Sequence, residues 1–166
     1  VMPGWTDLVA SAHRIGGRLK ERRETVAVAE SSAGGLISAA LLAVPGASVY
    51  FMGGGVIYTA AARQALVGIS LDQMAGIRSS SEPYAQLLAR TVRGRLGTSW
   101  GLAETGAAGP TGNRYGDAAG HSCMAVAGVT ERVVTLETAS ADRDANMWAF
   151  ALAALDLFEA AIRDQS

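Results

Sequence analysis

Hydrophobic positions recur at two different spacings along the chain, and these spacings predict its helices and strands. Apolar residues three or four positions apart predict helices at 6–23, 34–44, 60–69, 81–97 and 142–164. Short β-branched or alternating apolar runs predict strands at 25–30, 48–59, 99–105, 121–129 and 131–139. Because helices alternate with strands, we expect an α/β fold with a mostly parallel sheet and an antiparallel hairpin near the C-terminus. We find no internal repeat or linker, so we expect a single domain over residues 1–166.

Glycine, proline and capping residues mark several of these boundaries. Pro45 and Gly46 end the helix before them. Ser81 and Pro83 are typical of the beginning of the next long helix. The glycines at 53–55 predict a bulge or a close approach of two backbones within their strand.

The composition favours a small ligand over a nucleic acid. The chain is 49% hydrophobic and 17% charged, with a formal net charge of −1. That charge argues against a broad basic face for nucleic acid, but it leaves room for a local cluster that binds a small anionic ligand. Apolar stretches are interrupted before about 18 residues, the length of a membrane span. We therefore expect no membrane insertion, and the first residues do not predict a signal peptide.

Cysteine and histidine are scarce in this sequence. Cys123 is the one cysteine, so an internal disulfide is impossible, and we expect a cytoplasmic protein with a buried, unreactive thiol. His13 and His121 are the two histidines, and with Cys123 they do not make the ligand set of a zinc site. We expect no metal and no cofactor.

A polar corner joins the first predicted strand to the helix that follows it. Glu30, Ser31 and Ser32 interrupt two apolar runs there. A strand, a sharp turn and a helix present a side chain at the carboxyl edge of a sheet, which favours Ser31 as a nucleophile or ligand contact and Glu30 as a ligand contact. The alternative is that Ser31 or Ser32 only caps the helix.

Small residues follow this corner. Ala33 permits a tight turn, and Gly34 and Gly35 leave the helix N-terminus open. Backbone N–H groups at such an end suit a phosphate, a carboxylate or a developing oxyanion. We therefore expect Ala33, Gly34 and Gly35 to contact the ligand.

A second candidate ligand segment is the glycine-rich loop at 104–121. It follows a predicted strand, so it lies at the same edge of the sheet as the corner. Thr105, Gly106 and Gly109 offer a hydroxyl and inward-pointing amides that suit a phosphate or a ribose. The loop lacks the lysine of a P-loop, so triphosphate hydrolysis is unsupported. The alternative is a structural loop packed on the sheet edge.

A serine nucleophile needs a base, and this chain offers few. Lys20 is its one lysine and lies in the first predicted helix. Ser31, Asp117 and His121 occur in the chain order of an α/β-hydrolase triad. Spacing alone does not bring Asp117 and His121 to Ser31, so this arrangement stays an alternative.

Several of these motifs together resemble the C-terminal family of the competence/damage-inducible protein CinA, which includes nicotinamide mononucleotide deamidases. The resemblance extends over residues 6–163, and its most specific parts are AESSAGG at the corner and ETGAAGPTG in the loop. It implies a three-layer α/β/α sandwich that forms homo-oligomers, dimers or larger. It also implies hydrolysis of the carboxamide of nicotinamide mononucleotide to nicotinate mononucleotide and ammonia.

The resemblance also implies roles for individual residues. The family's catalytic serine falls on Ser31, and the tyrosine and lysine of its Y-S-N-E-A-K pattern fall on Tyr58 and Arg63. A family arginine before the last helix falls on Arg143, and the loop from Thr105 to Gly112 would hold part of the ligand.

Two departures from the family pattern leave the function open. The Y-S-N-E-A-K segment reads YTAAAR, and the guanidinium of Arg63 stays protonated, so Arg63 can bind an anion but cannot act as a base. The loop continues as GNRYGDAAGH, unlike the commoner loop of the family. We expect an amidohydrolase with Ser31 as nucleophile, amides near Ala33–Gly35 for the oxyanion and Tyr58 as proton relay. The alternative is a ligand-binding homologue without turnover, acting as a sensor or partner subunit.

Overall fold

The centre of the fold is a five-stranded sheet in the order β2-β1-β3-β4-β5, as seen in a computed structural model that describes residues 3–165. The strands are β1 (Val26–Glu30), β2 (Phe51–Val56), β3 (Trp100–Ala107), β4 (His121–Ala127) and β5 (Arg132–Glu137). β1 pairs in parallel with β2 and β3, whereas β4 pairs antiparallel with both β3 and β5. The expectation of a mostly parallel sheet is therefore met only loosely, because a loop instead of a crossover helix joins β3 to β4.

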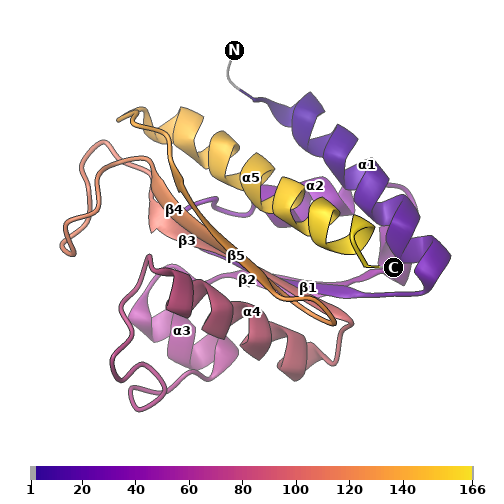
Figure 1. Ribbon diagram of the computed structural model, residues 1–166, viewed down its shortest axis with the longest axis horizontal. Helices are drawn as coiled ribbons and strands as arrows, with labels where there is room; N and C mark the ends of the chain where they lie inside the picture. Colours follow the sequence, from indigo (N-terminus) through magenta and orange to yellow (C-terminus); the bar gives the residue numbers. More distant parts are fainter. Residues whose placement is uncertain (1–2, 166) are drawn as a thin grey trace.

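Helices cover both faces of this sheet, which confirms the three-layer α/β/α arrangement. Figure 1 shows α1, α2 and α5 on one face and α3 and α4 on the other. Their bounds are α1 (Trp5–Arg22), α2 (Leu36–Leu42), α3 (Ala60–Val67), α4 (Glu82–Leu96) and α5 (Arg143–Arg163). By length and composition α5 could cross a membrane, as many core helices could, and half of its apolar window is buried.

The two faces of the sheet carry different side chains. In β1, Val26 and Val28 pack with α1 and α5, while Ala27 and Ala29 pack with α4. Because β1 is buried on both faces, its sequence is a continuous apolar run instead of an alternating one. The larger core lies on the α5 side, where Trp100 makes an edge-to-face contact with Phe158.

Residues 48–59 differ from the single long strand that their sequence predicts, because β2 covers only Phe51–Val56. A short 3₁₀ helix, Ala47–Val49, precedes β2, and the register of β2 against β1 shifts between Val26 and Ala27. A Cβ at Gly54 would lie 2.6 Å from the Val28 carbonyl oxygen. The irregular register falls at Met52, directly before the glycine run, and the close approach of backbones that the sequence predicts lies within the run at Gly54.

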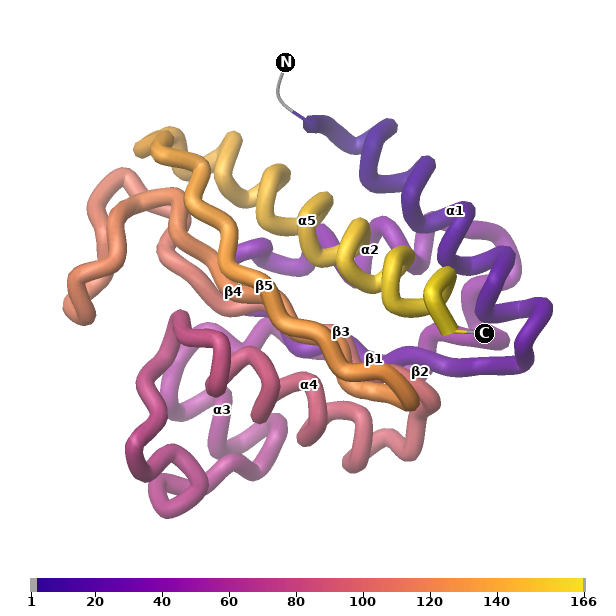
Figure 2. Tube along the Cα trace, viewed as in Figure 1, coloured from indigo at the N-terminus to yellow at the C-terminus, as the bar shows by residue number. Residues whose placement is uncertain are grey.

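The path of the chain brings distant segments to one end of the sheet. Figure 2 follows the trace from β1 into α2 and from β3 into the loop before β4. Ala29 of β1 is paired with Ala103 of β3, so the residues that follow both strands emerge side by side. Cys123 is buried in β4, as expected, and burial raises the pKa of its thiol.

Candidate active site

A cavity of about 570 Å³ opens where β1 and β3 end. The residues that line it come from five segments: Ser31, Ile57, Tyr58, Thr59, Ala60, Arg63, Met74, Ile77, Arg78, Ser79, Ser80, Tyr84, Thr105, Gly106, Arg114 and Tyr115. The corner after β1 and the glycine-rich loop after β3 therefore wall a single cavity, as the sequence predicts. Five of the predicted site residues meet there, namely Ser31, Tyr58, Arg63, Thr105 and Gly106.

The turn at Ser31 is held from below by the buried carboxylate of Glu104 in β3. The backbone N–H groups of Ser31 and Ala33 donate to one oxygen of Glu104, at 3.1 and 2.8 Å. The hydroxyls of Ser32 and Ser122 donate to the other oxygen. Burial raises the pKa of Glu104, while these four donors oppose that shift. Glu104 therefore fixes the position of Ser31 without facing the cavity.

Glu30 has a similar internal role at the start of α2. Its carboxylate accepts the backbone N–H groups of Gly35, Ile37 and Ser38 at 2.9 to 3.1 Å, and also the Ser38 hydroxyl. Glu30 is fully buried and does not line the cavity. The sequence predicted that Glu30 contacts the ligand, but the structure places it as the cap of α2.

The amides after Ser31 also face internal acceptors. Ala33 donates to Glu104, Gly34 to the Ser31 carbonyl at 3.0 Å, and Gly35 to Glu30. This arrangement departs from the expectation that Ala33, Gly34 and Gly35 bind a ligand or an oxyanion. Buried acids beside the helix end engage the donors of Ala33 and Gly35, and a backbone carbonyl engages that of Gly34.

Two groups at the corner remain available. Within residues 3–165 the structure gives no hydrogen-bond partner to the Ser31 hydroxyl or to the backbone N–H of Ser32. Ser31 is 9% exposed and lines the cavity. Ser32 is buried and does not line the cavity, but its N–H is the one amide between Ser31 and Gly35 that no internal acceptor among the described residues engages.

Tyr58, Arg143 and Gly109 are linked at one rim of the cavity. Arg143, the first residue of α5, donates to the Tyr58 hydroxyl at 3.1 Å and to the Gly109 carbonyl at 2.5 Å. Tyr58 is 60% exposed and lines the cavity, whereas Gly109 and Arg143 do not. Arg143 thus connects the glycine-rich loop to Tyr58 instead of lining the site itself.

Arg63 and Thr105 lie deeper in the cavity wall. The Arg63 guanidinium of α3 stands 5.6 Å from the centre of the Tyr84 ring. Burial raises the pKa of Tyr84, and the nearby Arg63 lowers it in part. The Thr105 hydroxyl accepts the Ser80 backbone N–H at 3.2 Å. Gly106 beside it permits close packing, because a Cβ there would lie 2.4 Å from the His121 carbonyl oxygen.

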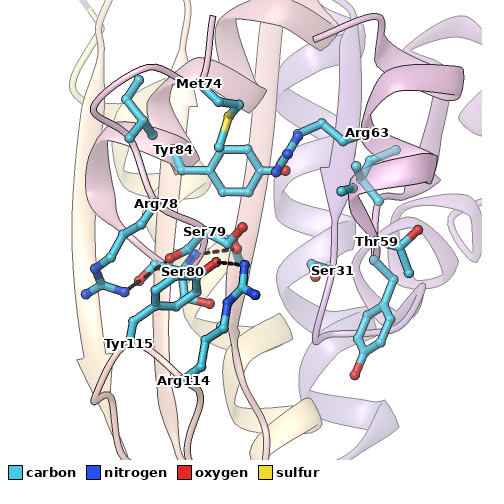
Figure 3. Close-up of a pocket in the computed structure, with 16 residues that line it drawn as sticks. Ser31, Thr59, Arg63, Met74, Arg78, Ser79, Ser80, Tyr84, Arg114 and Tyr115 are labelled. Atoms are coloured by element: carbon cyan, nitrogen blue, oxygen red, sulfur yellow. Dashed lines mark hydrogen bonds between the residues drawn. The ribbon is translucent and has the colours of Figure 1, made fainter. Parts of the chain in front are cut away.

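Sequence reasoning missed the other lining residues, among them two arginines and two tyrosines, Arg78, Arg114, Tyr84 and Tyr115. In Figure 3 Arg63 and Arg114 enter the cavity from opposite sides, with the rings of Tyr84 and Tyr115 on one flank and Ser31 on the other. Arg78 forms an ion pair with Asp117, but no acidic partner of Arg63 or Arg114 occurs in the described part of the chain. The departure of GNRYGDAAGH from the common family loop was the one signal that pointed to Arg114 and Tyr115.

The alternative of a Ser31–Asp117–His121 triad is not supported by the geometry. Asp117 lies 3.6 Å from Nε2 of His121, so this pair of the triad is adjacent. However, the ring nitrogens of His121 contact Glu137 at 2.5 Å and the Ser80 carbonyl at 2.7 Å, and the Asp117 carboxylate is paired with Arg78. Neither Asp117 nor His121 lines the cavity beside Ser31. Burial lowers the pKa of His121, but Glu137 and the Ser80 carbonyl together raise it above its ordinary value.

Known proteins with similar sequences carry the CinA name. A family model described as the CinA C-terminal domain matches residues 9–162. A CinA-like protein of Prochlorococcus marinus is 46% identical over 110 residues, covering 66% of this chain and 26% of that protein. A CinA-like protein of Anaeromyxobacter sp. strain K is 37% identical over 146 residues, covering 88% of this chain and 36% of that protein. The chain thus corresponds to about a quarter to a third of these relatives.

Solved structures show the same fold. The competence/damage inducible protein CihA of Agrobacterium tumefaciens superposes with a TM-score of 0.86 at 26% identity, covering 96% of this chain and 97% of that one. A CinA superfamily protein of Klebsiella pneumoniae gives a TM-score of 0.87 at 21% identity, covering 94% and 98%. The family model, the curated relatives and the shared fold confirm the resemblance seen in the sequence. They show that this chain belongs to the CinA C-terminal domain family.

Proposed function

We propose that this domain hydrolyses the carboxamide of nicotinamide mononucleotide or a related nucleotide amide, with Ser31 as nucleophile. The observation that carries the proposal is the Ser31 hydroxyl, which has no partner within residues 3–165 and opens into a cavity with two guanidiniums free of ion pairs in that range. An amide carbon at Ser31 and an anionic group at an arginine would fit one small nucleotide.

The reaction would proceed by acyl transfer. The Ser31 oxygen bonds to the amide carbon, and the Ser32 N–H stabilises the oxyanion that forms. The hydroxyl of Tyr58, oriented by Arg143, relays the serine proton to the departing ammonia. Water then cleaves the acyl–Ser31 ester and releases the carboxylate nucleotide. Arg63 cannot accept a proton, so its charge contributes to the positive potential that attracts an anionic ligand into the cavity.

A specific observation favours a second candidate, a homologue that binds the nucleotide without turning it over. The described residues that line the cavity include no histidine, lysine, aspartate or glutamate. A hydroxyl without a general base reacts slowly with an amide. In that case the domain would act as a sensor or as a partner subunit.

Ammonia release distinguishes the two. The purified protein is incubated with nicotinamide mononucleotide, and ammonia and nicotinate mononucleotide are measured for the wild type, Ser31→Ala and the control Ser48→Ala, which changes an exposed serine. Release that is lost in Ser31→Ala and kept in Ser48→Ala supports the hydrolase. Binding measured by calorimetry without ammonia supports the second candidate, and activity that emerges only in Arg63→Lys would identify the natural chain as a binder.

A further inference from the structure

We infer that Arg114 and Tyr115 form a phosphate-binding subsite that selects phosphorylated ligands for this cavity. The inference rests on the proposed function for the identity of the ligand, but its test does not require turnover. Both residues belong to the segment 113–117, which continues the glycine-rich loop in a way that departs from the common family pattern.

The segment 113–117 is held rigidly. The Asn113 side-chain oxygen accepts the backbone N–H groups of Tyr115 and Asp117 at 3.0 and 3.1 Å. Asp117 in turn accepts two bonds from the Arg78 guanidinium, at 2.6 and 3.1 Å. Gly112 permits this turn, because a Cβ there would lie 2.0 Å from the Asp117 carbonyl oxygen. A loop fixed in this way loses little entropy when a ligand binds.

The Arg114 guanidinium is positioned but not neutralised. Tyr115 lies between two arginines, with the Arg78 and Arg114 guanidiniums 5.3 and 5.1 Å from its ring centre. Arg114 donates one hydrogen bond to the Tyr115 hydroxyl at 3.1 Å. Residues 3–165 provide it with no carboxylate partner. A guanidinium has five N–H donors, so most of those of Arg114 remain for a bidentate anion such as phosphate.

The place of Arg114 in the cavity suggests how a ligand would lie. Arg114 and Arg63 enter from opposite sides, and Ser31 lies on the flank facing the two tyrosine rings (Figure 3). The hydrogen bond from Arg114 lowers the pKa of the Tyr115 hydroxyl most, and Ser79 lowers it further. Both guanidiniums, of Arg63 and Arg114, line the same cavity. A nucleotide amide with its carboxamide at Ser31 would place its phosphate at Arg114.

The test compares two ligands that differ only in the phosphate. Affinities for nicotinamide mononucleotide and nicotinamide riboside are measured by calorimetry in a Ser31→Ala background, where hydrolysis does not deplete the ligand. Arg114→Gln is expected to weaken binding of the mononucleotide about 10- to 100-fold, as for a lost charge-assisted contact, and to change riboside binding less than about threefold. Arg114→Lys keeps the charge but loses the planar pair of N–H donors, so its affinity for the mononucleotide is expected to lie between those of the wild-type residue and Arg114→Gln.

Two further variants make the result specific. Tyr115→Phe keeps the ring and removes the bond that holds Arg114, so a smaller loss confined to the mononucleotide is expected. Arg14→Gln, on α1 across the sheet, is the matched control and is expected to leave both affinities unchanged. Equal losses for both ligands in Arg114→Gln, or no loss for either, would overturn the inference. Circular dichroism of each variant confirms that it is folded.

The outcome separates this inference from the proposed function. If the wild type binds the mononucleotide without releasing ammonia and Arg114→Gln weakens that binding selectively, the subsite stands and the hydrolase fails. If ammonia is released with an unchanged KM in Arg114→Gln, the hydrolase stands and the subsite fails.

Discussion

Replacing Glu104 tests whether one buried acid determines the shape of the corner. Glu104→Ala would remove the acceptor of the Ser31 and Ala33 amides and of the Ser32 and Ser122 hydroxyls. The Ser122 hydroxyl has a second acceptor, a backbone carbonyl at 3.2 Å, so three buried donors would lose their only acceptor among residues 3–165. At about 1–3 kcal/mol for each buried unsatisfied donor, the cost is roughly 3–9 kcal/mol. That cost is comparable to a typical total stability of about 5–15 kcal/mol.

Glu104→Gln is the sharper variant because it separates the shape of the acid from its charge. Burial raises the pKa of Glu104 in the folded protein. The stability that the acid contributes is therefore fully present below its unfolded pKa and lost as the pH rises through its folded pKa. Glutamine has the same shape and no proton to lose. We expect the unfolding free energy of the wild type to exceed that of Glu104→Gln most at about pH 4, and this excess to shrink at higher pH.

Urea unfolding followed by far-ultraviolet circular dichroism measures both effects. Glu21→Ala, an exposed glutamate on α1, is the matched control and is expected to change the unfolding free energy by less than about 0.5 kcal/mol. A loss of less than about 1 kcal/mol in Glu104→Ala would refute the reasoning, because one buried donor left unsatisfied would cost at least that much. A pH-independent difference between the wild type and Glu104→Gln would refute the assigned direction of the pKa shift.

Three other variants test the surroundings of the corner. Gly106→Ala places a Cβ 2.4 Å from the His121 carbonyl oxygen, so thermal denaturation should show a loss of about 2–4 kcal/mol, and an unchanged melting temperature would contradict the close packing. Arg143→Gln removes the hydrogen bond to the Tyr58 hydroxyl, so the kcat of ammonia release should fall about tenfold or more. Circular dichroism checks that the variant is folded. An unchanged kcat would show that Arg143 has no part in the proposed proton relay. Glu137→Gln removes the largest of the contacts that raise the pKa of His121. The stability from this contact is full below the unfolded pKa of His121 and is lost as the pH rises through the folded pKa, so the variant should melt at a lower temperature than the wild type at pH 5.5 and at the same temperature at pH 9. An equal deficit at both pH values would refute the pairing.

The sequence predicted the elements and the convergence of two segments well, because both depend on local pattern. Parallel strands bring their carboxyl ends together, so Ser31 and Thr105 could be placed at one edge from spacing alone. The antiparallel pairing of β3 with β4 was missed, because the apolar run at 121–127 does not indicate which strand pairs with it or in which direction.

The chemistry of the corner could be predicted only in part. Glu30 precedes the helix by a few residues, yet its role as the cap of α2 depends on a turn that folds its carboxylate back onto three amides. Glu104 acts 71 residues away on Ala33, and such long-range pairs leave no mark in one sequence. Arg114 lines the cavity from a loop that Asn113 and Asp117 hold through contacts that sequence spacing does not reveal.

The two buried acids at the corner, Glu30 and Glu104, hold the backbone of the turn and do not contact the Ser31 hydroxyl. The carboxylates of Glu104 and Glu30 accept the N–H groups of Ser31, Ala33 and Gly35, so the turn is formed on folding and does not need a ligand to order it. The Ser31 hydroxyl shares in none of that anchoring within residues 3–165. A substitution of the Ser31 side chain would therefore leave the hydrogen bonds of the turn intact. An active enzyme and a ligand-binding homologue without turnover could share the same fold and the same cavity.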